Sequence, residues 1–404
     1  MLAAMTLPRV GGLRVVAAVA VLIVGSGCGA KVLETPDAGD GGARDGTVRD
    51  GSTDASPATD SSVDCGVDAR CGSDASADSP GDAGSDTSTG DAAPDVGIPC
   101  GSCAGNCDTS SGRCDVTLAT GQNHPAVIAV DTTSVYWTND GTSSSTADGS
   151  VMKVPLDGGA PLTLAMGQSS PFGIAVDAMS VYWANSSSST VTKVPLDGGA
   201  PVTLASGVVE WVCLAVDGTS VYWTEEDNPS GAVRKVPLDG GAPLTLASGP
   251  GLWPYGIAVD TTRVYFTNHG AEGTFGGSVL AVPLDGGALV TLASGLDYPL
   301  GIAVDRTSVY WAEYYGGTLM KAPLDSGAPV TLASGVRPYF VAVDATSLYW
   351  TDYSAGTVTK VPLDGGAPVT LASGQKSPMG VAIDGTSVYW TNYSGGTVMK
   401  ATPK

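Results

Sequence analysis

Between residue 116 and the end of the sequence, one pattern of about forty residues occurs seven times. Each copy contains four strand-sized segments, I-A-V-D, V-Y-W-T-N, V-x-K-V-P and V-T-L-A, and the third and fourth are joined by L-D-G-G-A-P. A repeat of this length with four short strands is typical of a β-propeller blade. The sequence therefore predicts an all-β fold, a seven-bladed β-propeller of four-stranded blades.

The spacing that recurs in each repeat unit predicts which strand of the blade each segment forms. The I-A-V run has no polar face, as expected of an inner strand packed between neighbouring blades, and Asp-Gly-Gly supplies the positive φ angles of a tight hairpin. The Asp of A-V-D is expected to cap the following turn through its side chain. A large aromatic side chain recurs once per unit, as blade-on-blade packing requires: Trp137, Trp183, Trp223, Phe266, Trp311, Trp350 and Trp390.

The first and last segments of the repeat are complementary. The region begins with a fourth strand, Val116 to Ala119, and ends with a third strand, Val398 to Pro403. We therefore expect the N-terminal strand to complete the last blade and close the ring.

The N-terminal residues 1–28 have the features of an export signal. Arg9 and Arg14 precede an apolar run from Val15 to Val24, which is too short to span a bilayer. The run ends at Gly25-Ser26-Gly27-Cys28, which resembles a bacterial lipoprotein signal and predicts lipidation of Cys28. The alternative is ordinary secretion after cleavage. We expect a protein of the cell envelope or extracellular space, held at a membrane through a lipid anchor only.

Two further segments precede the propeller of residues 116–404. Residues 29–98 are rich in Asp, Gly and Ser and lack large apolar side chains, which predicts a disordered linker. Residues 99–115 form a small Cys-rich segment with four cysteines: Cys100, Cys103, Cys107 and Cys114. Outside the cytosol these four are expected to form two disulfides, and three pairings are possible. Cys213, alone in a strand, is expected to be a buried small apolar residue.

The charge of the chain excludes one class of partner. The net charge is −21, and residues 116–404 alone hold 23 acids against 12 bases. Such a surface repels polyanions, so we expect no binding of nucleic acid. We also expect a monomer.

Length variation places the functional face. Successive Asp residues of A-V-D lie 39 to 46 positions apart, and nearly all of this variation falls between the second and third strands. Because strands alternate in direction, these loops share one face with the connections between blades. Varied loops on a rigid frame are where binding usually resides.

Aromatic and acidic residues gather on that face and suit a carbohydrate, a peptide or a basic patch of a partner protein. The candidate ligand-binding residues are Trp211, Glu225, Glu226, Trp253, Tyr255, His269, Phe275, Tyr298, Glu313, Tyr314 and Tyr339. The alternative is that Trp211 and Trp253 merely plug the mouth of the channel.

A polar residue also follows each repeated aromatic position by two. Such a ring could coordinate calcium or a sugar, but hydrogen bonds to neighbouring backbone are the favoured interpretation: Asn139, Asn185, Glu225, Asn268, Glu313, Asp352 and Asn392.

The phrases Y-W-T-N, Y-W-A-N, Y-W-T-E and Y-W-T-D, with A-V-D before and L-D-G-G after, resemble the YWTD repeats of low-density-lipoprotein-receptor-type propellers. They also resemble bacterial relatives of the NHL and gluconolactonase kind. Receptor-type members have six blades, whereas seven units are present here. The resemblance implies the propeller architecture, whereas the different blade number does not allow specific ligands to be transferred. Lactonases and streptogramin lyases of similar fold place a metal with acids or a His at the channel mouth, as His269 with Glu225 and Glu313 could be arranged here.

The sequence thus favours a tethered extracytoplasmic binding or scaffold propeller that presents its varied face to a protein or glycan. No Ser-His-Asp set, metal-binding His pair or phosphate loop is evident, and we expect no catalytic residue and no cofactor. The alternative is a metal-dependent lyase or lactonase that acts at the channel mouth. A purely structural envelope spacer is a third, weaker option.

Overall fold

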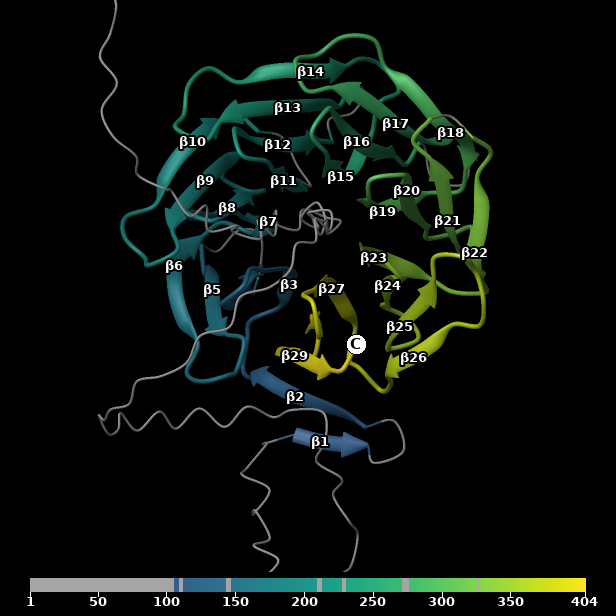
Figure 1. The fold of residues 1–404 in the computed structure, drawn as a ribbon. Coiled ribbons are helices and arrows are strands. Elements are labelled where there is room, and N and C mark those ends of the chain that lie inside the picture. The colour runs from purple at the N-terminus through teal and green to yellow at the C-terminus, as the bar shows by residue number, and fades with distance from the viewer. Residues whose placement is uncertain are drawn as a thin grey trace, which may run out of the picture.

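The computed structural model describes residues 105–108, 112–142, 147–208, 213–226, 230–270, 276–325 and 327–404. Every regular element in these ranges is a β-strand. The strands form seven antiparallel sheets arranged around a central axis (Figure 1), so the predicted seven-bladed propeller is confirmed. No helix with the length and apolar character needed to cross a bilayer occurs within these ranges.

Each blade runs from its innermost to its outermost strand in chain order, apart from the last. The first blade contains β3 (Pro125–Val130), β4 (Ser134–Asn139), β5 (Gly149–Pro155) and β6 (Leu162–Gln168). The second contains β7 (Pro171–Val176), β8 (Ser180–Asn185), β9 (Thr190–Pro195) and β10 (Val202–Ser206). The third contains β11 (Leu214–Val216), β12 (Ser220–Glu225), β13 (Ala232–Pro237) and β14 (Leu244–Ser248).

The next three blades repeat this order. The fourth contains β15 (Pro254–Val259), β16 (Arg263–Asn268), β17 (Gly277–Pro283) and β18 (Val290–Leu296). The fifth contains β19 (Pro299–Val304), β20 (Ser308–Glu313), β21 (Thr318–Pro323) and β22 (Val330–Ser334). The sixth contains β23 (Pro338–Val343), β24 (Ser347–Asp352), β25 (Thr357–Pro362) and β26 (Val369–Ala372).

The seventh blade joins the two ends of the propeller region. Its inner strands are β27 (Pro378–Ile383), β28 (Val388–Asn392) and β29 (Thr397–Thr402), and β2 (Arg113–Ala119) pairs with β29. A further strand, β1 (Gly105–Asp108), pairs with β2 on the side away from β29, as Figure 1 shows. The predicted closure is confirmed, but the boundary predicted at residue 116 is wrong. Residues assigned to a separate Cys-rich segment extend the closing strand and add a fifth strand, because a free sheet edge offers unpaired backbone groups.

The core lies between the blades. The repeated Trp side chains are almost completely buried, and the inner two strands of most blades are buried along their whole length. Separate apolar clusters join the second blade to the third, the fourth to the fifth, the fifth to the sixth, and the seventh to the first. Blade-on-blade packing of the aromatic position is therefore confirmed.

The Asp of A-V-D organises each inner hairpin, as expected. In the first blade, Asp131 Oδ1 accepts hydrogen bonds from the backbone of Thr133 (2.7 Å) and Ser134 (2.8 Å). Its Oδ2 accepts a third from the hydroxyl of Tyr136 (2.8 Å). The same Asp–Tyr pair recurs in all seven blades. This clamp fixes the turn on the face opposite the varied loops.

Two polar side chains tie neighbouring blades together. The Thr after the repeated Trp donates from a fully buried hydroxyl to a carbonyl of the next blade, as Thr138 does to Phe172 (2.8 Å). The Lys of V-x-K-V-P donates to a carbonyl at the other face of the next blade, as Lys153 does to Leu196 (2.6 Å). Both ties also join the last blade to the first. The blades are therefore linked at both faces as well as by their apolar core.

Candidate functional site

The varied face is built by two sets of loops that bind each other. The loop between second and third strands donates a backbone hydrogen bond to the connection that enters the same blade. His269 N bonds the carbonyl of Trp253 (3.1 Å), and Tyr314 N bonds that of Tyr298 (3.1 Å). Side chains from both loop sets are thereby held together at the mouth of the channel.

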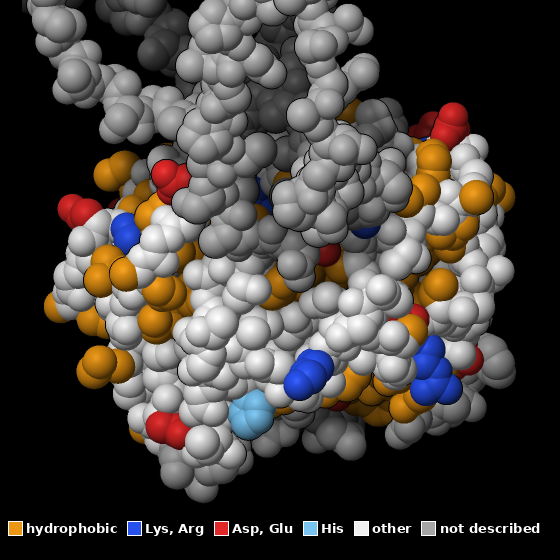
Figure 2. Space-filling view, turned by 90° about the horizontal axis from the view of Figure 1, so that it is seen from below, with side chains coloured by type: hydrophobic (Ala, Val, Ile, Leu, Met, Phe, Trp, Pro, Cys, Tyr) orange, Lys and Arg blue, Asp and Glu red, His pale blue; other side chains and the backbone are white. Residues whose placement is uncertain are grey.

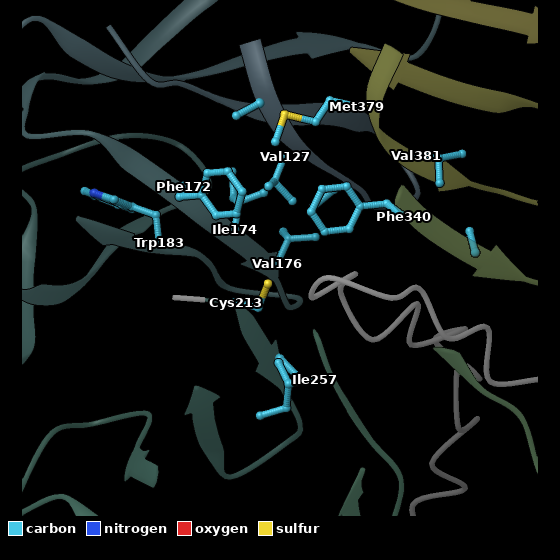
Figure 3. Packing of buried hydrophobic residues seen from close by; sticks show 14 of the residues in the cluster. Val127, Phe172, Ile174, Val176, Trp183, Cys213, Ile257, Phe340, Met379 and Val381 are labelled. Atoms are coloured by element: carbon cyan, nitrogen blue, oxygen red, sulfur yellow. The ribbon is translucent and has the colours of Figure 1, made fainter. Parts of the chain in front are cut away.

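Apolar side chains fill the centre of the ring next to this mouth. Phe172 of the second blade and Phe340 of the sixth point toward each other, with ring centroids 6.4 Å apart (Figure 3). Phe340 stands where four other blades carry Gly, so its large side chain reaches inward. Both rings are buried, and we call this pair the apolar plug.

Six aromatic side chains form a closed series of ring contacts at the mouth, which we call the aromatic cycle. Its members come from the fourth, fifth and sixth blades: His269, Tyr298, Tyr315, Tyr314, Tyr339 and Tyr255. Neighbouring ring centroids in the cycle are 4.7 to 6.5 Å apart. Trp253 stacks on His269 from outside the cycle, at 6.0 Å. Tyr339 also touches Phe340 at 5.0 Å, so the cycle adjoins the apolar plug.

The hydroxyls of Tyr255 and Tyr339 lie 3.0 Å apart and share a hydrogen bond across the fifth blade. Burial raises the pKa of both phenols, and the negative charge of Glu226 raises them further. The two hydroxyls therefore remain neutral, and the carboxylate of Glu226 is near enough to act on both rings.

His269 is the most constrained polar group of the cycle. Its Nδ1 lies 2.7 Å from the carbonyl oxygen of Gly270, and because a carbonyl oxygen can only accept, Nδ1 carries a hydrogen. Its Nε2 lies 3.1 Å from Glu226 Oε1 but makes no aligned hydrogen bond to any described residue. The distance supports a charge contact, whereas the alignment does not support a full hydrogen bond. Nε2 is thus a buried nitrogen that faces a carboxylate.

The predicted candidates separate into two groups. Glu226, Trp253, Tyr255, His269, Tyr298, Tyr314 and Tyr339 are brought together at the mouth. Trp211 and Phe275 lie outside the described residues. Glu225 and Glu313 are buried below the mouth and belong to the polar ring that follows the repeated aromatic positions.

That polar ring is engaged in local bonds. Glu225 accepts from the Trp223 indole (2.8 Å) and pairs with Arg234 (2.9 Å), and Glu313 accepts from the Trp311 indole (3.2 Å). The predicted bonds to neighbouring backbone are found for Asn268, Glu313 and Asp352. The prediction is wrong for the other four residues, which bond side chains instead: Asn139, Asn185, Glu225 and Asn392. No group of three or more His, Cys, Asp or Glu side chains within the described ranges is arranged to hold a metal ion.

Two cysteines are described in their bonding. Cys114 in β2 and the fully buried Cys213 are disulfide-bonded. Cys213 is buried as expected, but the expectation that it acts only as a small apolar residue is wrong, since its sulfur forms a disulfide. The side chains of Cys100, Cys103 and Cys107 lie outside the described residues, as does Cys28, so the pairing and the lipidation stay predictions.

The sequence reasoning named Glu226, His269 and Tyr314 singly but missed that they share one position of the repeat, immediately after the polar ring. This position carries five different residue types in the seven blades, with Tyr in the last three: Asp140, Ser186, Glu226, His269, Tyr314, Tyr353 and Tyr393. Tyr353 touches Tyr339 at 6.2 Å, and the Tyr393 hydroxyl donates to Asp140 (3.0 Å). A position with five residue types in seven copies, beside one that is always polar, was the signal available in the sequence.

A separate surface hollow of about 470 Å³ lies between the last and first blades. It is lined by Gly121, Gln122, Asn123, His124, Tyr393, Ser394, Gly395 and Gly396. His124 stacks on Tyr393 at 4.8 Å, and Gln122 is occupied by Trp137 and Asn139. Its lining is mostly polar and open, and it does not include the aromatic cycle, which has the more specific chemistry.

Comparison with known proteins supports the fold and leaves the family open. No family model matches the chain, and no curated protein matches it either. A solved streptogramin B lyase is similar, with TM-score 0.60 and 13% identity over 72% of this chain and 97% of that chain. Virginiamycin B lyase from Staphylococcus aureus has a TM-score of 0.58 and 14% identity, over 72% of this chain and 98% of that chain. Oligogalacturonate lyase from Vibrio parahaemolyticus has a TM-score of 0.56 and 11% identity, over 74% of this chain and 96% of that chain. At these identities the similarity shows the propeller fold alone.

Proposed function

We propose that this chain is an extracytoplasmic binding propeller that captures a group of a protein or glycan partner at its channel mouth. The observation that carries the proposal is the aromatic cycle beside the apolar plug, on the face where the loops differ between blades. We also propose that the chain is a YWTD-like or NHL-like propeller, that Cys28 is lipidated, and that a flexible acidic linker follows it. They would hold the domain at a membrane while the mouth remains free to meet a partner.

Three properties of the mouth support binding. Tyr298, Tyr314 and Tyr339 are partly exposed, so their rings remain available to a ligand. Buried anchors and inter-loop hydrogen bonds hold the rings in place, which lowers the entropic cost of binding. Aromatic faces with a few polar groups are typical of sites that bind sugars or partner side chains.

The proposal is tested with the full chain on a glycan array and in a pull-down from cell envelope. Trp253→Ala should weaken capture at least tenfold while leaving the unfolding midpoint within a few degrees of that of the parent. Met179→Ala, at an exposed position on the opposite face, serves as the matched control. Unchanged capture by Trp253→Ala would contradict the proposal, and loss of folding would make Trp253 a structural plug.

A second candidate function rests on His269. A buried imidazole nitrogen facing a carboxylate is an arrangement that can remove or deliver a proton, and the lyases named above share the fold. A lyase acting at the mouth would lose turnover in His269→Ala but not in His124→Ala. Quinupristin and oligogalacturonate, named with the similar structures, are the first substrates to assay. No turnover of either class by the parent protein would count against this candidate.

A further inference from the structure

The aromatic cycle combines ring faces with a nearby negative charge, and both features favour a positively charged ligand. Aromatic faces carry negative electrostatic potential and attract cations within about 6 Å of the ring centroid. Glu226 touches the cycle through His269. The described loops on this face carry four carboxylates, Asp140, Asp148, Glu226 and Asp297, against two cationic side chains, Arg337 and Lys376.

The chain already places one of its own cations on the cycle. The guanidinium of Arg337 lies over the ring of Tyr314, 6.0 Å from its centroid. Arg337 is exposed, and no ion pair with a carboxylate is found for it among the described residues. A solvated cation that rests on a tyrosine face shows that this surface accepts positive charge.

The other exposed apolar surfaces do not offer a comparable site. Six blades each expose one aliphatic side chain near the start of the outermost strand: Leu162, Val202, Leu244, Leu289, Val330 and Val369. In Figure 2, hydrophobic side chains lie in small separate groups on the visible surface. Nothing about these groups identifies an occupant, whereas the mouth combines aromatic rings with a carboxylate.

We propose that the aromatic cycle and Glu226 together bind an organic cation, such as a quaternary ammonium or the side chain of a methylated lysine or an arginine. The inference rests on the proposed binding function and deepens it by assigning the charge of the captured group. Tyr298, Tyr314 and Tyr339 supply ring faces, and Glu226 supplies the countercharge. The neutral Tyr255–Tyr339 hydroxyl pair holds two of the rings without adding a competing charge.

The test uses the full chain, titrated with tetramethylammonium and with the uncharged isostere neopentyl alcohol, and followed by calorimetry and tyrosine fluorescence. Tetramethylammonium should bind about tenfold more tightly than the isostere, as expected for a cation on aromatic faces. Peptides with trimethyllysine, arginine or alanine at one position distinguish a polypeptide source from a free ammonium compound. Preference for a charged peptide over tetramethylammonium would assign the polypeptide source, and the reverse would assign the small cation.

Variants separate the two contributions. Glu226→Gln should lower affinity for the cation about fivefold and leave binding of the isostere unchanged, whereas Tyr339→Leu should lower cation affinity about tenfold. Tyr339→Phe keeps the ring face but loses the bond to Tyr255, so it should lower cation affinity less than Tyr339→Leu does. Arg337→Ala should strengthen binding, because it frees the face of Tyr314. Asp140→Asn, a carboxylate on the same face outside the cycle, is the matched control and should have less effect than Glu226→Gln.

The results also distinguish this inference from the function on which it rests. Equal affinity for the cation and its isostere, or an unchanged affinity in Glu226→Gln, would overturn the cationic assignment. Binding of a neutral glycan in a Trp253-dependent manner, without binding of any cation, would overturn the inference and leave the proposed function standing. Failure of every ligand class to depend on Trp253 would overturn both.

Discussion

Thr391 donates a hydrogen bond of 2.6 Å from its hydroxyl to the backbone carbonyl of Ala126, which lies 265 residues earlier in the chain. Thr138 makes the same bond to Phe172 between the first and second blades. The hydrogen bond between the seventh and first blades is therefore equivalent to the one between the first and second blades.

The first prediction concerns this closing bond. Thr391→Val keeps the shape of the side chain but leaves the buried Ala126 carbonyl without its donor, so the free energy of unfolding should fall by about 1–3 kcal/mol. Thr138→Val should cost a similar amount, because its bond is equivalent. Urea unfolding of both variants checks the expectation. A much larger loss in Thr391→Val alone would show that the closure is weaker than the other joints.

The second prediction concerns the outer strands of the seventh blade. A variant that begins at Gly105 retains β1 and β2 and should melt in one transition close to that of the full chain. A variant that begins at Thr120 lacks both strands and should unfold at a markedly lower temperature, because the whole ring loses its closure. Calorimetry distinguishes the two, and equal melting temperatures would contradict the closure.

The third prediction concerns the close approach of inner strands. A Cβ at Gly380 would lie 2.7 Å from the Ala126 carbonyl oxygen, whereas a Cβ at Gly385 in the same blade would meet nothing within 4 Å. Gly380→Ala should therefore lower the free energy of unfolding by about 1–3 kcal/mol, and Gly385→Ala should not lower it. Chemical denaturation of the pair provides the measurement, and equal stability of the two variants would be inconsistent with the packing.

The fourth prediction concerns acid stability. Burial alone would raise the pKa of Asp344, but the hydrogen bond and charge of Lys404 (2.8 Å), with backbone bonds from Thr346 and Ser347, hold it at about 2. Because the folded pKa is lowered, this stabilisation is present above about pH 4 and is lost as the pH falls toward 2. Lys404→Met should flatten the decrease in unfolding free energy over that range.

Lys321→Met is the control for this acid-range experiment. Lys321 bonds the Leu363 carbonyl (3.1 Å) rather than a carboxylate, so its replacement should lower stability by a similar amount at every pH. An identical pH profile for Lys404→Met and Lys321→Met would rule out the assigned cause.

The fifth prediction concerns alkaline stability. Burial and the Asp partner raise the pKa of the seven clamp tyrosines, including Tyr222 and Tyr310, well above 10. A raised folded pKa means that the stabilisation is complete below pH 10 and is lost as the pH rises further. Unfolding free energy should therefore drop steeply above pH 10, and Tyr222→Phe should reduce the steepness. Absorbance at 295 nm should report delayed ionisation of the clamp tyrosines, and normal titration of all tyrosines in the folded protein would contradict the clamp.

The architecture could be read from the sequence because its causes lie in side chains repeated at fixed spacing. Trp137 and its counterparts mark the interfaces, Asp131 and its counterparts mark the turns, and the incomplete last unit marks the closure. The inter-blade bonds of Thr138 and Lys153 escaped prediction because their acceptors are backbone carbonyls, which leave no trace in the sequence. The strand β1 escaped it because Gly105–Asp108 contains no apolar alternation.

The sequence placed the candidate site on one face of the propeller, but it did not show which side chains contact one another there. Loop lengths located the face, and Trp253, Tyr255 and His269 were recognised there as departures from the repeat. The apolar plug required a contact between Phe172 and Phe340 on blades that are not neighbours, and nothing in the order of residues brings these blades together. Nor did the sequence indicate that Glu225 and Glu313 are buried and that each accepts a bond from an indole nitrogen.

The register of the seventh blade places Cys114 directly opposite Thr402. A short peptide could therefore join the two ends of the propeller region, and new ends could be opened at the connection between any two blades. Circular permutants made in this way should fold to the same ring, with a leader attached beside whichever blade the engineer chooses.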